Sequence, residues 1–338
     1  MPKRAALKLA GLAGLSALAR RATASQLRIL CYHGLWLAPG APHGNCLFMT
    51  PALFADRMAR LARSGRPVLP LGEAVERLAA NRLPAGAVVI TIDDGWASTH
   101  SHMLPVLEAH GLPATLYATT WYAGRALPVV NVAVDYLIAA SGRCDQNRAA
   151  AIRRIETLAE ADRLEALRAY GRALGVGEAW LACRQFHLMG QEELADAHVR
   201  GLDIQLHTHR HIDVSSRIGQ LVPEIEANRA ALRPATGGAV AEHFCYPSGT
   251  FHPAAPALLA ASGVRSATLV SEGLNAPGAS PYALRRFVDG QHVPMAGFQA
   301  YLDGTLHYLS LARALAGRVE IAVPRRVAAA SGMLLCAL

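Results

Sequence analysis

Short apolar runs alternate with segments of helical periodicity along most of the chain. In the run 87–92, five of six residues are apolar and four of those five are β-branched, which is typical of a strand buried on both faces. Similar runs predict strands at 27–32, 113–118, 202–206, 243–246 and 265–270. Helical spacing and end signals predict helices at 51–64, 71–80, 98–110, 191–200, 223–232, 253–261 and 298–315, the last with Gly304 as a weak point. This alternation predicts an α/β fold with a parallel sheet or a (β/α) barrel.

The rhythm changes between about 122 and 188, where helical segments follow one another without a strand. We interpret this stretch as a helical insertion on the main fold, with a separate helical domain as the alternative. The predicted division is an N-terminal segment 1–26, a main domain 27–295 that carries the insertion, and a helical extension 296–338.

The N-terminal segment has two interpretations. Lys3 and Arg4 precede a short apolar stretch, which is the outline of a secretory signal. However, Lys8 interrupts the stretch, and leucines at 12, 15 and 18 recur at helical spacing. We therefore favour an uncleaved amphipathic helix on a membrane surface or on the protein itself. A cytoplasmic or membrane-associated location is favoured, and a periplasmic or secreted location stays open.

Composition narrows the class of protein. The chain is 52% hydrophobic and 17% charged, with a formal net charge of +8, so a substantial core is expected. The basic residues are mostly single arginines and no nucleic-acid-binding motif is present, which argues against a nucleic-acid partner. The six cysteines are scattered without a Cys-x-x-Cys pair, which favours buried, reduced thiols over a disulfide framework.

Polar side chains gather where three predicted strands end. Asp93 and Asp94 follow the run 87–92, and neighbouring side chains in a strand point to opposite faces, so one acid can bind a metal while the other handles a proton. His207 and His211 follow the run 202–206. Two histidines and a carboxylate form a catalytic metal set, most often for zinc. The turn at 247–249 can present backbone N–H groups to an oxyanion.

These motifs, in this order, resemble those of the polysaccharide deacetylase family, also called the NodB-homology or carbohydrate esterase family 4 group. Thr91-Ile-Asp-Asp-Gly95 resembles the family's Thr-Phe-Asp-Asp-Gly motif, His207-Thr-His-Arg-His211 its His-[Ser/Thr]-x-x-His motif, and Phe244-Cys-Tyr-Pro-Ser-Gly249 its third block. Cys31-Tyr32-His33 is similar to the Tyr-His start of the exopolysaccharide-associated and PgaB-like branches. The resemblance spans roughly residues 27–287, except the insertion.

The resemblance implies a distorted (β/α) barrel of the NodB-homology type, with one divalent metal ion, most often Zn²⁺. It implies that Asp94, His207 and His211 bind the metal and that Asp93 is the general base. It further implies an oxyanion donor at the backbone N–H of Ser248 and a catalytic histidine, for which His292 is the nearest candidate. His33 is a second histidine that can line the site. The implied substrate is an N-acetylated sugar of a polysaccharide or its precursor.

Two departures from the family pattern keep alternatives open. Cys245 stands where the better-known branch has an arginine that steadies the base, and Ser248 stands where it has a tyrosine. The orientation of Asp93 is then expected to depend on whether Arg285 or Arg286 replaces the missing arginine. The alternatives are a hydrolase of a non-sugar amide or an O-acetyl ester, and a non-catalytic glycan-binding homologue.

Overall fold

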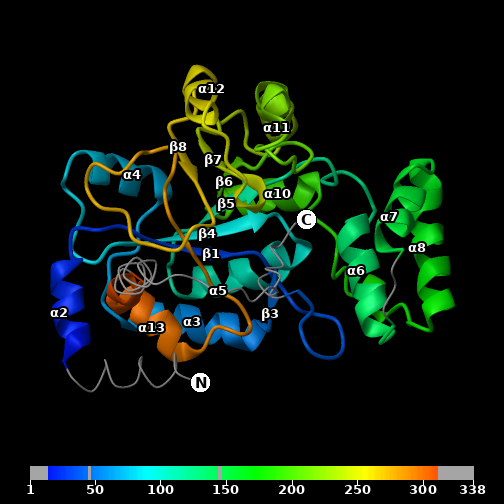
Figure 1. Cartoon of the computed structure of the whole chain (residues 1–338), viewed down its shortest axis with the longest axis horizontal. Helices are drawn as coiled ribbons and strands as arrows, with labels where there is room; N and C mark the ends of the chain where they lie inside the picture. Colours follow the sequence, from blue (N-terminus) through cyan, green and yellow to red (C-terminus); the bar gives the residue numbers. More distant parts are fainter. Residues whose placement is uncertain (1–13, 45–46, 144–146, 311–338) are drawn as a thin grey trace, which may run out of the picture.

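The computed structural model describes residues 14–44, 47–143 and 147–310. Its centre is a curled sheet of seven parallel strands, which forms a half-barrel in the order β8-β7-β6-β5-β4-β1-β9 (Figure 1). The strands are β1 (Arg28–Tyr32), β4 (Val88–Asp94), β5 (Thr115–Ala118), β6 (Asp203–Leu206), β7 (His243–Cys245), β8 (Ser266–Thr268) and β9 (Phe287–Val288). The predicted α/β fold with a distorted (β/α) barrel is confirmed.

One segment near β9 contacts both β8 and β1 and so connects the two sides of the curled sheet. Leu284 exchanges backbone hydrogen bonds with Ala267 and Leu269, at and just after β8. Three residues later, Phe287 pairs with Leu30 of β1. The segment therefore bridges the two sides of the curled sheet. Arg286 lies in the middle of this bridge, and its side chain is fully buried.

Helices cover the outer face of the sheet and one end of the barrel. They are α3 (Pro51–Arg63), α4 (Leu71–Ala79), α5 (Leu104–Ala109), α10 (Gln191–Val199), α11 (Leu221–Leu232), α12 (Ala255–Ala261) and α13 (Met295–Leu302). The predicted start of α3 is confirmed, because the Thr50 side chain accepts a hydrogen bond from the Leu53 N–H. Helix α4 packs its apolar face, which includes Leu71 and Leu78, against the inner side of the strands.

Two helix predictions need correction. The predicted helix 98–110 begins as a π-helical turn, Thr99–Met103, before α5. The predicted helix 298–315 is not continuous, because α13 ends at Leu302 and Gly304 has a φ of 80°. That value lies outside the helical region, and glycine adopts it at little cost. Residues 311–315 lie outside the described residues.

The insertion forms a helical lobe beside the barrel (Figure 1). It contains α6 (Val130–Ala140), α7 (Arg148–Glu156), α8 (Glu160–Leu174) and α9 (Ala179–Ala182). Its apolar core continues into Trp36, Phe48 and Trp96 of the barrel side, where β2 (Gly34–Leu35) and β3 (Phe48–Met49) form a small second sheet. This shared core supports the interpretation as an insertion, and the division of the chain at 27, 296 and 122–188 stays a prediction.

The N-terminal segment is described only from residue 14 onward, and it contains the helix α2 (Leu15–Ala22). Half of the predicted N-terminal segment 1–26 therefore lies outside the described residues. Among the helices described, none combines the length and the apolar character that crossing a membrane requires.

Candidate metal centre and active site

The three predicted motifs meet at the carboxyl ends of neighbouring strands. Asp93 and Asp94 are the last residues of β4, and His207 follows β6. Asp94 is paired with Ala118 of β5, which is paired in turn with Leu206 of β6. This register brings Asp94 and His207 to one rim of the barrel, which is where parallel α/β folds place their sites.

Asp94, His207 and His211 form a cluster that we call the metal triad. The Asp94 Oδ1 atom lies 3.3 Å from His207 Nε2 and 3.6 Å from His211 Nε2. Ligand atoms about 2.0–2.2 Å from a tetrahedral zinc ion are roughly 3.3–3.6 Å apart. The spacing of these three atoms therefore fits a single metal ion of that size, and the two histidine rings are already held 4.9 Å apart, centroid to centroid.

Hydrogen bonds leave the appropriate atoms of the triad facing one another. The Trp96 indole N–H donates to Asp94 Oδ2 at 2.8 Å, whereas Asp94 Oδ1 is buried without a hydrogen-bond partner among the described residues. The Nδ1 atom of His207 lies 2.9 Å from the Cys245 carbonyl oxygen, so in the neutral ring Nδ1 carries the proton and Nε2 has the lone pair. Such outer contacts fix the orientation of metal ligands. The unpartnered Oδ1 and the free Nε2 fit a bound cation.

Burial and charge set the protonation of the triad. Burial by itself would raise the pKa of Asp94, but its contact with His207 and the charges of His33 and His211 lower that pKa overall. Burial and the neighbouring His207 lower the pKa of His211 to about 4. Burial by itself would lower the pKa of His207, but its contacts with Cys245 and Asp94 raise that pKa overall. An ionised carboxylate and a neutral imidazole are the forms that bind metals, so a cation would displace the second proton of His207.

The backbone of the rim is held in uncommon conformations. Six non-glycine residues among those described have positive φ, and four of them belong to this rim: Asp94 (72°), Thr208 (60°), His211 (55°) and Ser248 (52°). Each such conformation costs on the order of 1 kcal/mol and tends to occur at functional sites. The buried Asn228 connects the neighbouring strand ends, because it accepts a hydrogen bond from the His207 N–H at 2.9 Å and donates to the Ala118 carbonyl oxygen.

Asp93 points to the barrel interior and is paired with Arg286. Arg286 Nη1 and Nη2 donate to Asp93 Oδ1 and Oδ2, each at 2.7 Å. Of Arg285 and Arg286, the two candidates for the missing arginine, Arg286 is therefore the one that contacts Asp93. Burial alone would raise the pKa of Asp93, but the charge and hydrogen bonds of Arg286 outweigh it and hold that pKa well below its usual range.

Two buried thiols complete the surroundings of Asp93. Cys31 Sγ and Cys245 Sγ lie 3.5 and 3.4 Å from Asp93 Oδ2. Cys245 Sγ also lies 3.0 Å from Arg286 Nη2. The residue that departs from the family pattern therefore contacts the same carboxylate, while the positive charge comes from the bridge segment. The cysteines that the structure describes are free, as predicted.

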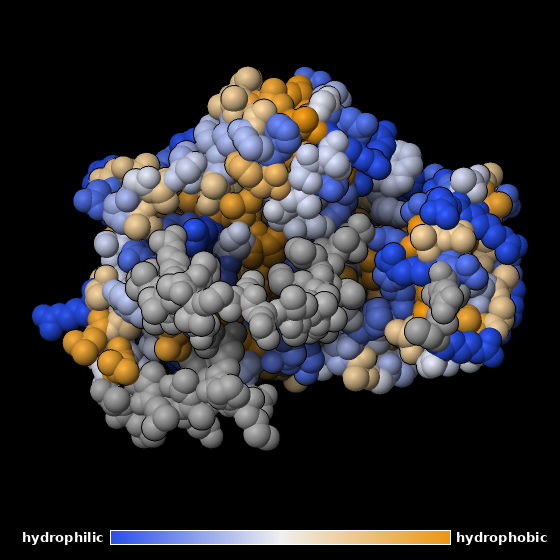
Figure 2. Space-filling model, in the orientation of Figure 1, coloured by the Kyte–Doolittle hydropathy of each residue, from blue (hydrophilic) through white to orange (hydrophobic). Residues whose placement is uncertain are grey.

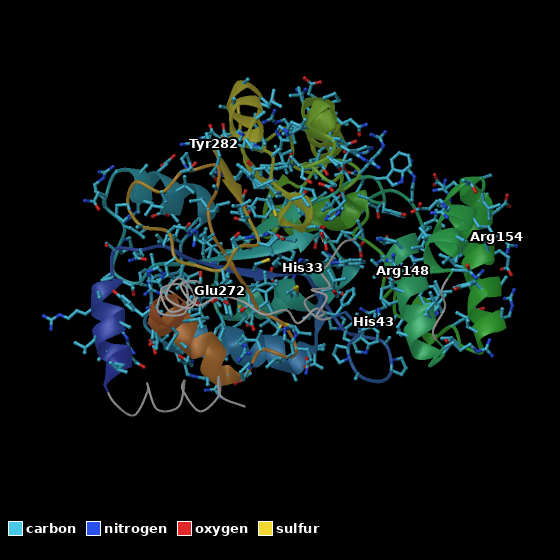
Figure 3. The ribbon with its side chains drawn as sticks, viewed as in Figure 1. His33, His43, Arg148, Arg154, Glu272 and Tyr282 are labelled. Atoms are coloured by element: carbon cyan, nitrogen blue, oxygen red, sulfur yellow. The ribbon has the colours of Figure 1, made fainter. Side chains whose placement is uncertain are left out.

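The other predicted residues lie at different distances from this centre. Ser248 is on the turn after β7 and is partly exposed. His33 follows β1, its Nε2 is 3.9 Å from Asp93 Oδ2, and its side chain is 12% exposed; Figure 3 places it near the middle of the molecule. His292 is exposed on the loop before α13. Of these two histidines, His33 is the one with a described contact to Asp93, and the roles of all three residues stay predictions.

A cavity of about 480 Å³ opens beside the metal triad. Asp94 and His211 line its inner end, Trp121 and Tyr122 line one wall, and residues of α7, among them Arg148, line another. Arg148 is on the side of the insertion that faces the barrel (Figure 3). The guanidinium of Arg125 stacks 3.9 Å above the Trp121 ring. The cavity therefore offers an aromatic and cationic surface within reach of the metal triad.

Sequence reasoning missed two residues that support this site. Trp96 follows the Asp-Asp-Gly motif directly, so its position next to Asp94 was a usable signal. Asn228 lies on α11, 21 residues after the backbone N–H that it contacts, and no local pattern marks it.

Comparisons with known proteins agree with this fold and motif set. The family model described as polysaccharide deacetylase matches residues 80–267, more than half of the chain. The chain belongs to the polysaccharide deacetylase family, a family of hydrolases. No curated protein is significantly similar to it in sequence.

Three solved structures show the same fold. The Streptococcus pyogenes deacetylase PplD in complex with acetate has 15% sequence identity and a TM-score of 0.59, with 83% of this chain and 99% of that chain covered. IcaB from Ammonifex degensii has 20% identity and a TM-score of 0.55, with 82% and 97% covered. A de-N-acetylase from Aggregatibacter actinomycetemcomitans has 14% identity and a TM-score of 0.54, with 82% and 99% covered.

Proposed function

We propose that this chain is a metal-dependent hydrolase that removes acetyl groups from N-acetylated sugars of a polysaccharide or of its precursor. The observation that carries the proposal is the separation of two adjacent carboxylates: Asp94 contacts two histidines, while Asp93 is ionised and held by Arg286. Membership of the family supports deacetylation. One similar solved structure is named as a de-N-acetylase, which favours the N-acetyl group.

In this proposal Asp94, His207 and His211 hold one divalent cation, with Zn²⁺ preferred for a site of two imidazoles and one carboxylate. When bound, the cation supplies a Lewis acid that polarises a carbonyl group and acidifies a water molecule. Trp96 and the Cys245 carbonyl group keep the ligands oriented. A set of three protein ligands leaves a coordination position open, as catalytic sites require.

Each of the remaining residues has a proposed role in moving a proton or stabilising charge. Asp93 accepts a proton from the attacking water, and Arg286 fixes the direction of its oxygens. The backbone N–H of Ser248 donates to the developing oxyanion. The leaving amine needs a proton donor, for which His33 and His292 are the candidates, and the 3.9 Å contact with Asp93 favours His33.

We place the chain in the exopolysaccharide-associated, PgaB-like branch on the strength of Cys31-Tyr32-His33, whose histidine lies beside Asp93. The proposed partner is an acetylated glycan, which Trp121 and Tyr122 can contact through aromatic stacking in the cavity. Exopolysaccharide biosynthesis is the proposed setting.

Contact with a membrane surface is also part of the proposal. Helix α2 exposes Leu15 (49%) and Leu18 (65%) next to Arg20 and Arg21, and Figure 2 shows apolar surface at the position of α2. Apolar side chains beside basic ones are typical of helices that lie at a membrane interface.

Acetate release from chito-oligosaccharides tests the catalytic part of the proposal. The Asp93→Asn variant should lose about 10²–10⁴-fold in turnover, the usual contribution of a general base, and should keep its metal. His33→Gln should lose activity more strongly than His292→Gln. Because Asp93→Asn leaves Arg286 buried without a counter-charge, circular dichroism of each variant must first show a folded protein.

Other results select the alternatives. Acetate release from O-acetyl esters but from no N-acetylated sugar favours the esterase alternative. Metal and glycan binding without acetate release from any substrate favours a non-catalytic glycan-binding homologue.

A further inference from the structure

A second cavity, of about 520 Å³, adjoins the start of β4, whereas Asp94 lies at the end of that strand. It is lined by residues of α2, α3 and α13. These three helices lie on one side of the barrel in Figure 1. Four arginines line the cavity: Arg20, Arg60, Arg63 and Arg66. Among the described residues of the lining, Asp303 is the one carboxylate. We call this cavity the arginine pocket.

The positive charge of the arginine pocket is only partly balanced. Asp303 Oδ1 accepts from Arg20 at 3.1 Å and from Arg66 at 2.9 Å, so one carboxylate serves two guanidinium groups. Arg60 is paired with Asp56 on the exposed side of α3. Arg63 has no side-chain partner among the residues that the structure describes, and it lies in the last turn of α3. The C-terminal ends of α2 and α3 each add about half a negative charge. The net charge of the lining stays positive.

A buried hydrogen-bond network lies beside the arginine pocket. Arg28 lies fully buried, and its guanidinium donates to the Leu302 carbonyl oxygen at 2.6 Å and to the Thr23 hydroxyl at 2.6 Å. These bonds join the end of α2 to the end of α13. Burial and the nearby charge of Arg66 lower the pKa of Arg28 to about 10, and Asp303 offsets this only in part. Arg28 therefore adds another cation beside the arginine pocket, and its hydrogen-bond partners are neutral carbonyl and hydroxyl oxygens.

We propose that the arginine pocket binds a phosphate group. A guanidinium fork matches two phosphate oxygens with parallel hydrogen bonds, and several such forks around one cavity favour a multiply charged anion over a carboxylate. Arg63 is exposed, and Arg20 is 60% exposed and shares Asp303 with Arg66. Both can turn toward a ligand, while Arg66 is 9% exposed and lies in the wall. The phosphate belongs either to a soluble ligand or to an anionic lipid headgroup. The site is independent of deacetylation.

Binding of pyrophosphate to the full-length protein tests the proposal by isothermal titration calorimetry at constant ionic strength. Wild-type protein should bind, and Arg63→Gln should bind about tenfold more weakly, which corresponds to ~1.4 kcal/mol for one charge-assisted hydrogen bond. Arg77→Gln is the matched control, because Arg77 is an exposed arginine of α4 that is paired with Glu73 outside the pocket. Its affinity should equal that of the wild type.

Vesicle sedimentation identifies the source of the phosphate. If binding to phosphatidylglycerol vesicles, but not to phosphatidylcholine vesicles, falls in Arg63→Gln and stays unchanged in Arg77→Gln, the ligand is a lipid headgroup. Pyrophosphate binding that depends on Arg63, without vesicle binding, assigns a soluble ligand. If Arg63→Gln and Arg77→Gln behave alike in both assays, the proposal is overturned. Acetate release, measured on the same variants, should not change.

Discussion

The two adjacent aspartates illustrate how surroundings divide the work of identical side chains. Asp93 and Asp94 both lie in β4 and both are almost fully buried. The alternation of a strand turns Asp93 toward Arg286 in the barrel interior and Asp94 toward the histidines at the rim. One carboxylate is neutralised by a fixed guanidinium, whereas the other has an oxygen without a partner in the described structure. The proposed roles of base and ligand follow from this difference.

At the scale of single residues, Trp96→Phe should weaken metal binding. The change keeps an aromatic ring but removes the N–H that holds Asp94 Oδ2. Loss of such an outer contact lowers metal affinity by about 10–100-fold, which competition with a chromophoric Zn²⁺ chelator can measure. Trp36→Phe is the control, because Trp36 belongs to the same aromatic cluster and donates to the Gly40 carbonyl oxygen away from the triad. Equal Zn²⁺ affinity in both variants would contradict the proposed role of Trp96.

The site was predictable from the sequence where its residues are close in the chain. The four-residue spacing of His207 and His211 and the neighbouring Asp93 and Asp94 are local patterns, and the structure brings the predicted ligands together. The sequence left Arg285 and Arg286 as equal candidates for the partner of Asp93. Asp93 is 193 residues away from Arg286, and only the closure of the barrel selects Arg286 over Arg285. The Cys31 thiol next to Asp93 depends on the pairing of β1 with β4, which no local spacing reveals.

At the scale of elements, the periodicity of the long strands and helices predicted most of the sheet. It did not predict β9, because Phe287–Val288 is too short for an alternating pattern. The residue just before β9, Arg286, is nevertheless the partner of Asp93 in the barrel. Nor did it predict that the insertion would share its core with Trp96. Phe48 lies against both Trp96 and Phe186, so the insertion is packed onto the residue that orients Asp94.

The junction between the insertion and α10 should respond to acid through His187. Burial, and next the charge of Arg184, lower the pKa of His187 to about 4, and its Nδ1 is buried without a partner in the described chain. The unfolded chain has a histidine pKa of about 6.5, so the folded state prefers the neutral ring. This contribution to stability is fully present above about pH 6.5 and is lost as the pH falls toward 4.

Urea unfolding at pH 7 and pH 5 measures this effect. The wild-type free energy of unfolding should fall by about 1–2 kcal/mol more than that of His187→Gln over this interval, given 1.36 kcal/mol per pKa unit. His110→Gln is the control, since His110 is exposed at the end of α5. If His187→Gln and the wild type lose equal stability, protonation of His187 does not contribute to acid unfolding.

At the scale of the whole molecule, the metal triad joins segments that separate when the chain unfolds. Asp94 ends β4, the two histidines follow β6, and β5 lies between these strands. The carbonyl group that orients His207 comes from β7. An ion at this site therefore binds the folded chain and not the unfolded one, so metal binding and folding are thermodynamically linked.

Metal removal should consequently lower the melting temperature. Free Zn²⁺ at 100 times its dissociation constant stabilises a single-site protein by ~2.7 kcal/mol. With an unfolding entropy of about 2.1 cal/mol/K per residue, this corresponds to roughly 4 °C for a chain of 338 residues. Differential scanning calorimetry of chelator-treated and Zn²⁺-loaded protein measures this shift. His207→Ala should abolish it. His209→Ala should keep it, because His209 contacts Thr120 rather than the triad. A shift that survives in His207→Ala but not in His209→Ala would place the ion elsewhere in the molecule.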